Sequence, residues 1–179
     1  SGGYGSGMGG AIFNYQGEVA IEKVDPRKHT IRKQKIVGIT KTITPDDSLI
    51  CFEPNSLANN TPSRKTIISM NHGILYKGKM IMAKKFAGKF DGVYKIPYNR
   101  ESLYNVLLET HNKMMVNNLI CETLNPENPV AQLYTQLQRI PKNKHSAVIE
   151  EFNRLCIENN LYGTNKNTQK KEFTFKMSV

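Results

Sequence analysis

Short apolar runs broken by turn residues fill residues 11–124 of the chain. The runs are rich in Val, Ile, Thr and Phe, which favour strands, and turn residues recur roughly every 6–12 positions, as in all-β domains. The expected strands are 11–15, 18–24, 29–32, 35–42, 48–53, 65–70, 73–76, 80–83, 92–96, 103–108 and 114–121. The pattern predicts a mostly β, antiparallel domain.

Residues 103–121 show this pattern most clearly. Two apolar strands, 103–108 and 114–121, flank the polar segment 109–113. Apolar strands on both sides of a short polar segment predict a β-hairpin.

Helical spacing replaces strand spacing after Pro126. Asn128 can cap a helix that has Pro129 at its first position and ends at Pro141, and Ser146 can cap a second helix. The apolar stripes are Val130, Leu133, Tyr134, Leu137 and Ile140 in the first helix and Val148, Ile149, Phe152, Leu155 and Cys156 in the second. We expect a helical hairpin over 128–160 that packs on the β domain or, alternatively, on a protein partner.

The two ends of the chain have their own patterns. Residues 1–10 are mostly glycine, which predicts a flexible arm. Residues 173–179 alternate between apolar and polar, which predicts a terminal strand or one exchanged with a protein partner. The expected division is an arm at 1–10, a β domain at 11–124, and a helical hairpin with a β tail at 125–179.

Composition narrows the classes of function. The 179 residues carry a formal net charge of +10, and 39% are hydrophobic. The lysines are scattered without a nucleic-acid motif, so we expect a solvated basic surface, with weak polyanion contact as the alternative. No apolar run approaches the ~20 residues that span a bilayer, and no secretory signal is seen, which predicts an intracellular protein.

Cysteine and histidine positions predict neither a disulfide framework nor a metal site. Cys51, Cys121 and Cys156 lie far apart in the sequence, and their number is odd. The four histidines have no metal-ligand spacing. We expect no cofactor and no metal.

Three sequence blocks carry the candidate chemistry. Ser69 lies three residues before His72, between two apolar strands. Upstream, the block Gly17-Glu-Val-Ala-Ile-Glu leads into a turn that contains proline. Downstream, Leu103-Tyr-Asn-Val-Leu-Leu is followed by a His-Asn pair at residues 111–112.

In this order the blocks resemble the Hint domain, the self-cleaving module of inteins and hedgehog proteins. That family has Thr-x-x-His where this chain has Ser69 and His72, and a V-Y-D-L strand followed by His-Asn where this chain has 103–112. The resemblance covers about residues 11–124. It extends to Hint-like modules encoded by large DNA viruses, which implies a viral protein and adds the virion as a location.

The resemblance implies chemistry on the chain's own backbone, with its flanking polypeptide as the substrate. In a Hint domain a first-residue Cys or Ser attacks the preceding carbonyl, and a histidine protonates the departing amide nitrogen. The resemblance implies that His72 is this acid and that Ser69 and Asn117 are orienting groups.

At the position of the nucleophile the chain differs from the family's usual cysteine. The nucleophile should lie near residues 4–6, where the chain has no cysteine, and Ser6 is the nearest hydroxyl, with Ser1 as a second candidate. Cys121 is a candidate relay nucleophile.

The end of the resembling region differs from inteins. An intein ends in His-Asn and releases its second flank by cyclising the Asn side chain, whereas this chain has Glu122 and Thr123. The resemblance therefore implies self-cleavage by an acyl shift without splicing. Hedgehog-type domains also lack the final His-Asn and continue into an extension, and 128–160 occupies that place here.

Two functions without self-cleavage remain as alternatives. A Hint-derived scaffold that has lost its nucleophile would serve as a structural or assembly module, for example of a viral particle. The net charge of +10 also fits a basic nucleic-acid-binding protein of another β fold.

Overall fold

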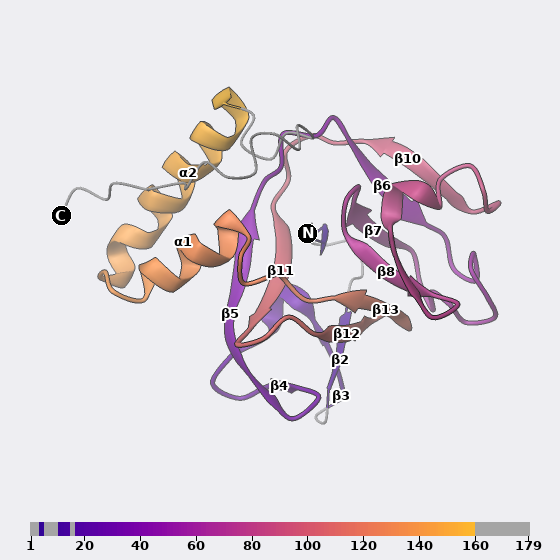
Figure 1. Ribbon diagram of the computed structural model, residues 1–179, viewed down its shortest axis with the longest axis horizontal. Coiled ribbons are helices and arrows are strands. Elements are labelled where there is room, and N and C mark those ends of the chain that lie inside the picture. The colour runs from indigo at the N-terminus through magenta and orange to yellow at the C-terminus, as the bar shows by residue number, and fades with distance from the viewer. Residues whose placement is uncertain (1–3, 6–10, 15–16, 160–179) are drawn as a thin grey trace.

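The computed structural model describes residues 4–5, 11–14 and 17–159. All the strand pairs in this part of the chain are antiparallel, and they form two sheets beside a pair of helices (Figure 1). The expected fold class, mostly β and antiparallel with a C-terminal helical hairpin, is confirmed. The expected terminal strand at 173–179 lies outside the described residues.

The larger sheet has seven strands. Their order is β10 (Val93–Pro97), β6 (Ser48–Phe52), β7 (Thr66–Ser69), β1 (Tyr4–Gly5), β11 (Leu103–Leu108), β5 (Gln34–Thr42) and β4 (Thr30–Ile31). The short strand β1 therefore lies between β7 and β11, although it comes from the segment predicted as an arm.

The smaller sheet has six strands. Their order is β3 (Gly17–Ala20), β2 (Ala11–Asn14), β12 (Lys113–Val116), β13 (Leu119–Glu122), β8 (Gly73–Tyr76) and β9 (Lys79–Met82). The main core lies between the two sheets. The larger sheet contributes Ile50, Phe52, Ile68 and Val106 to this core, and the smaller sheet contributes Ile74, Met114, Val116 and Leu119. Burial of this apolar surface is the main force that holds the sheets together.

The predicted hairpin over 103–121 is wrong. β11 pairs with β5 and β1 in the larger sheet, whereas the rest of the segment belongs to the smaller sheet. The expected strand 114–121 is itself a hairpin of β12 and β13, because Asn117 and Asn118 both have positive φ values, +49° and +64°. Asn tolerates this conformation, and two such residues make the tight turn of a hairpin.

The expected strand at 18–24 ends early. β3 stops at Ala20, and a 3-10 turn, η1 (Ile21–Lys23), follows. Ile21 and Val24 are both buried, and the Val24 N–H donates to the Ile21 carbonyl. A 3-10 turn places residues three apart on one side, so both side chains reach the core.

The helical hairpin packs on the outer side of β5 and β11. In α1 (Pro129–Leu137) the Asn128 side chain accepts the N–H of Val130 at 2.9 Å, so the predicted cap is confirmed. In α2 (His145–Asn159) the predicted cap is wrong, because the 3-10 turn η3 (Lys142–Lys144) runs directly into the helix and places Ser146 inside it. The apolar stripes of both helices pack with Val37 and Leu107 of the larger sheet.

A contact between α1 and β5 adds to this packing. The Tyr134 hydroxyl accepts the N–H of Lys41 at 2.7 Å and donates to the Lys41 carbonyl at 3.1 Å.

No helix in the described residues is both long and apolar enough to cross a bilayer.

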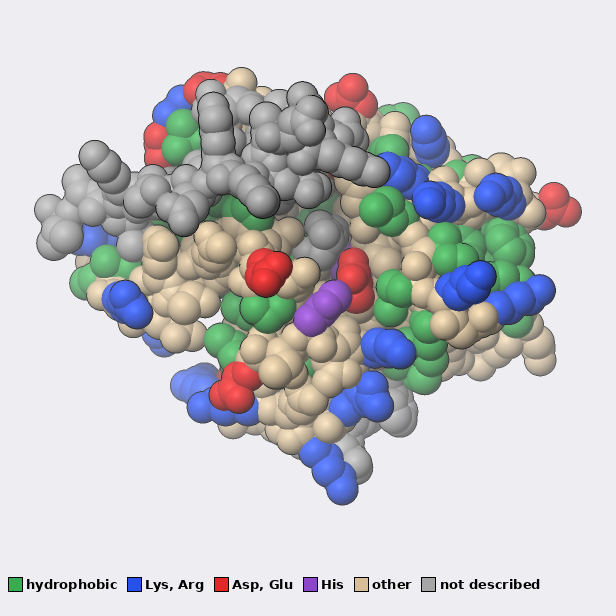
Figure 2. Space-filling model, in the orientation of Figure 1, with side chains coloured by type: hydrophobic (Ala, Val, Ile, Leu, Met, Phe, Trp, Pro, Cys, Tyr) green, Lys and Arg blue, Asp and Glu red, His purple; other side chains and the backbone are tan. Residues whose placement is uncertain are grey.

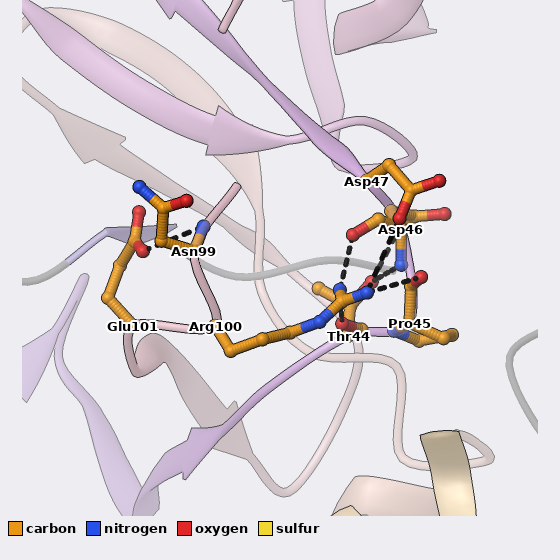
Figure 3. A network of polar contacts seen from close by, with 7 residues as sticks. All are labelled: Thr44, Pro45, Asp46, Asp47, Asn99, Arg100 and Glu101. Atoms are coloured by element: carbon orange, nitrogen blue, oxygen red, sulfur yellow. Dashed lines mark hydrogen bonds and ion pairs between the residues drawn. The ribbon is translucent and has the colours of Figure 1, made fainter. Parts of the chain in front are cut away.

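Arg100 ties the loop before β6 to the loop before β11 (Figure 3). Its guanidinium donates to the carbonyls of Thr44 at 2.6 Å and Pro45 at 3.1 Å, and also to the carbonyl of Asp46. A further contact of 3.5 Å reaches the Asp47 carboxylate. The planar guanidinium can serve several acceptors at once, which an ammonium cannot do in the same geometry.

We therefore expect Arg100→Ala to lower the free energy of unfolding by about 1–3 kcal/mol, since it leaves several acceptors without a charged donor. Arg100→Lys should recover less than half of this loss. Urea denaturation measures both variants, with the exposed Arg139→Ala as the control. Equal stability of the lysine variant and the wild type would contradict the role of the guanidinium geometry.

Candidate functional site

His72 lies in the turn between β7 and β8. The turn closes where the His72 N–H donates to the Ser69 carbonyl at 3.2 Å, and the His72 carbonyl accepts the N–H of Ala83 at 2.8 Å. The side chain is fully buried, with 0% exposure. These two hydrogen bonds hold the backbone of His72 through both its N–H and its carbonyl.

A backbone contact sets the state of the His72 ring. Nε2 lies 2.8 Å from the carbonyl oxygen of Glu122, and since a carbonyl can only accept, Nε2 carries the hydrogen. The neutral ring then has its lone pair on Nδ1, and the protonated ring has a second N–H there. Nδ1 is therefore the atom that can give or take a proton.

The Glu122 carboxylate holds the residue next to His72. Its Oε1 accepts the N–H of Gly73 at 3.0 Å, and its Oε2 lies 3.1 Å from Nε2 of His111. Glycine allows this approach, because a Cβ on Gly73 would lie 3.0 Å from Cδ of Glu122. Glu122 thus contacts both halves of the turn, through its carbonyl and through its carboxylate.

Strand β1 lies beside this turn. Tyr4 pairs with Ile68 on one side and with Tyr104 on the other. β1 runs antiparallel to both neighbours, so its N-terminal end points toward Ser69 and Asn105, the next residues of β7 and β11. Both side chains are buried, and they share the sheet face opposite to Ile68 and Tyr104, because side chains alternate along a strand.

Sequence reasoning assigned no role to Asn105, Glu122 or His111 in this site. Asn105 had a usable signal, since it is the one amide in the apolar strand 103–108 and stands where the Hint pattern has Asp. The contact of Glu122 with His111 joins the two ends of the β12–β13 hairpin, so it depends on the pairing of β12 with β13.

Two other predicted site residues, Asn117 and Cys121, lie on the β12–β13 hairpin. Asn117 is in the turn of this hairpin, at the opposite end of β13 from Glu122, and its side-chain amide donates to the Thr66 hydroxyl at 2.9 Å. Cys121 is fully buried in the main core, and its thiol lies 3.7 Å from the Leu119 carbonyl. Ser1 and Ser6 lie outside the described residues.

The cysteines in the described residues are free and buried. Burial raises the pKa of the Cys51 thiol, which keeps it in the protonated, less reactive form. Within the same part of the chain, no three His, Cys, Asp or Glu side chains come close enough to hold a metal ion.

The site can therefore transfer a proton at one fixed position. A buried histidine with a defined tautomer lies beside the end of a strand that is flanked by two buried polar side chains. General acid–base chemistry requires such a fixed proton donor near the reacting bond.

Comparisons with known proteins agree with the sequence blocks. The family profile described as the Hint domain matches residues 8–128. Among solved structures, the chain is similar to a DnaB intein from Synechocystis sp. PCC 6803, with 12% identity, coverage of 69% of this chain and 99% of that chain, and a TM-score of 0.47.

It is also similar to the Ssp DnaB mini-intein variant M86, with 11% identity, coverage of 69% and 95%, and a TM-score of 0.45. No curated protein matches the chain. The profile match spans more than half of the chain and confirms the predicted resemblance. The chain belongs to the Hint domain family, whose members act on their own flanking polypeptide.

Proposed function

We propose that this Hint domain cleaves the peptide bond before its own N-terminal segment by an N-to-O acyl shift. A serine Oγ forms a bond to the preceding carbonyl carbon, the C–N bond breaks, and the released nitrogen takes a proton from Nδ1 of His72. The serine hydroxyl proton returns to the ring. The observation that carries the proposal is the buried His72 with its Nε2 held by the Glu122 carbonyl.

The ester that forms is then opened by an acceptor. Water, or another nucleophile, adds to the ester carbonyl and releases the serine hydroxyl, so that the chain is cut and the serine is regenerated. Asn105 and Ser69 flank the end of β1 and are the groups we propose to orient the reacting peptide. Ser69 takes the place of the family's threonine.

The direction of β1 favours Ser1 over Ser6 as the nucleophile. The N-terminal end of β1 points toward Ser69, whereas its C-terminal end points toward Thr66, away from His72. Ser1 is the hydroxyl residue that precedes β1 in the sequence, and Ser6 follows it. The substrate in this proposal is a polypeptide joined to the amino group of Ser1.

The surroundings of Thr123 support cleavage without splicing. Thr123 stands where an intein has its cyclising Asn, and it is fully buried. Its N–H donates to the Asn112 carbonyl at 2.8 Å, and its hydroxyl accepts the Asn112 N–H at 2.9 Å. A threonine side chain has no amide that could attack its own carbonyl, so Thr123 cannot release a C-terminal flank by cyclisation.

A carrier protein fused to Ser1 tests the proposal. Incubation with hydroxylamine should release the carrier as a hydroxamate, because hydroxylamine attacks an ester far faster than a peptide bond. We expect Ser1→Ala to abolish the release and Ser6→Ala to retain it. Mass spectrometry of the released carrier identifies the cleaved bond.

Retained release in Ser1→Ala together with lost release in Ser6→Ala would identify Ser6 as the nucleophile. A released fragment that ends at Gly5 would also identify Ser6. Unchanged release in a Ser1→Ala, Ser6→Ala double variant would disprove the acyl shift at both serines.

An inactive Hint scaffold is the second candidate function. The observation in its favour is that residues 1–18 contain no cysteine. Under this alternative the fusion stays intact in hydroxylamine, and the domain serves as a structural module. The same assay therefore separates the two candidates.

A further inference from the structure

Within the described residues, strand β9 forms an edge of the smaller sheet. There it is the last strand in the sheet order and pairs with β8 alone. The two strands meet at the turn Lys77-Gly78, where Tyr76 pairs with Lys79. An edge strand leaves every second backbone N–H and C=O without a partner in the sheet.

The register shows which backbone groups face outward. In a hairpin with a two-residue turn the first pair, Tyr76 with Lys79, is a hydrogen-bonded pair, and such pairs recur at every second residue. The bond from the Ala83 N–H to the His72 carbonyl follows this pattern. The N–H and C=O groups of Met80 and Met82 therefore point away from β8, toward the open edge.

The side chains of Met80 and Met82 are also exposed. They are 40% and 44% exposed and lie two residues apart, hence on the same face of the sheet. Among the exposed large hydrophobic side chains of the described residues, these two are the pair that lies on one strand. Methionine is a flexible apolar residue that adapts to varied partners.

Lysines surround this edge. Lys77 and Lys79 lie at the hairpin turn, and Lys84 and Lys85 lie in η2 (Ala83–Lys85), which directly follows β9. Within the described residues none of the four forms an ion pair with a carboxylate. Figure 2 shows basic side chains interleaved with apolar ones over the part of the molecule that contains β8–β10.

We propose that the edge of β9 binds an extended acidic peptide with alternating apolar side chains. The peptide adds a strand to the smaller sheet, so that its backbone pairs with the outward groups of Met80 and Met82. Its apolar side chains cover the two methionines, and its carboxylates meet the lysines. This surface lies next to the His72–Gly73 turn, because Met82 pairs with Gly73, but peptide binding there does not depend on the proposed cleavage chemistry.

Charge favours such a peptide over a second copy of the chain. With a net charge of +10 two copies repel each other, and two lysine-rich edges would meet in a β9–β9 pair. Lysines also serve to keep edge strands from pairing, but two exposed methionines on the same strand work against that purpose.

Met82→Pro tests the proposal because it removes one outward backbone N–H of β9. Met82 has φ −61°, which matches proline, and its N–H points outward, so the substitution keeps the ladder with β8. The probe is a fluorescent peptide of alternating Glu and Val, about eight residues long. We expect fluorescence anisotropy to show binding to the wild type and at least about tenfold weaker binding to Met82→Pro.

Matched controls separate strand addition from charge attraction. Met82→Ala should weaken binding less than Met82→Pro, since it keeps the N–H. The same peptide with methylated backbone nitrogens should bind the wild type at least about tenfold more weakly, and this arm decides the question if Met82→Pro does not fold. The double variant Lys77→Glu, Lys79→Glu should also weaken binding.

Equal binding of the methylated and unmethylated peptides would overturn the proposal. So would tighter binding of a single-stranded oligonucleotide than of the peptide, because this would assign the lysines to a nucleic acid. Absence of peptide binding would leave the lysines with a protective role only and would likewise overturn it.

Discussion

Replacing His72 with alanine is expected to slow self-cleavage by about 100-fold to 10,000-fold, the usual contribution of a general acid. The physical reason is that the departing amide nitrogen is a very poor leaving group until it is protonated. The Glu122 carbonyl holds Nε2, so Nδ1 is the position from which the proton comes. The carrier fusion in hydroxylamine, followed by gel densitometry over time, measures this rate.

His145→Ala is the matched control for this variant. His145 also places its Nε2 on a backbone carbonyl, that of Ile140 at 2.9 Å, but it lies at the start of α2. We expect its cleavage rate to equal that of the wild type within about threefold. A rate in His72→Ala that matches the control would remove the histidine from the mechanism.

Thermal unfolding of each variant separates chemistry from folding. His72 is fully buried, and its loss leaves a cavity and an unmatched Glu122 carbonyl, so some loss of stability is expected. His72→Gln supplies a second measurement, because its amide can still donate to that carbonyl but cannot act as an acid at neutral pH. A folded, inactive glutamine variant would support the proposed role.

Replacing Phe152 with alanine is expected to lower the free energy of unfolding by about 3–5 kcal/mol. Phe152 is fully buried between the helices and the larger sheet, in a cluster that includes Leu107 and Leu133. A cavity of this size cannot close, because its walls come from two helices and a sheet that hold one another in place. Urea denaturation with an unchanged m-value measures the loss.

Ile157→Ala is the control for Phe152 because it lies on the same helix and is 40% exposed. We expect its change in free energy to stay within about 0.5 kcal/mol. The comparison also tests the predicted boundary between 11–124 and 125–179. A small effect of Phe152→Ala would mean that the helices contribute little to the fold and would favour a partner as the surface they cover.

Local patterns in the sequence account for much of the fold. Strand runs such as 35–42 and 73–76 follow from β-branched and apolar residues between turns, and they match β5 and β8 closely. The start of α1 follows from Asn128 and Pro129, because a cap depends on residues next to it. The Ser69–His72 block can be recognised in the sequence for the same reason, since its two residues are only three positions apart.

Pairing between distant strands could not be predicted in this way. The segments 103–108 and 114–121 are neighbours in sequence, yet they belong to different sheets, because each is buried against its own partners. Strands that are neighbours in sequence tend to pair as a hairpin. Here the burial of apolar surface in two separate sheets outweighs that tendency. Asn117 and Asn118 both tolerate positive φ, so the sequence carries a signal for this turn even though the apolar residues around it predict one strand.

By itself the sequence determined the mostly β class, the helical hairpin, the Hint family and the identity of His72 as the candidate acid. Each of these depends on residues close together in the chain or on motifs that keep their order. Only the tertiary structure placed β1 between β7 and β11 and brought Glu122 to His72 and Gly73. Contacts across about 50 residues depend on how the two sheets pack, and no local pattern records that packing.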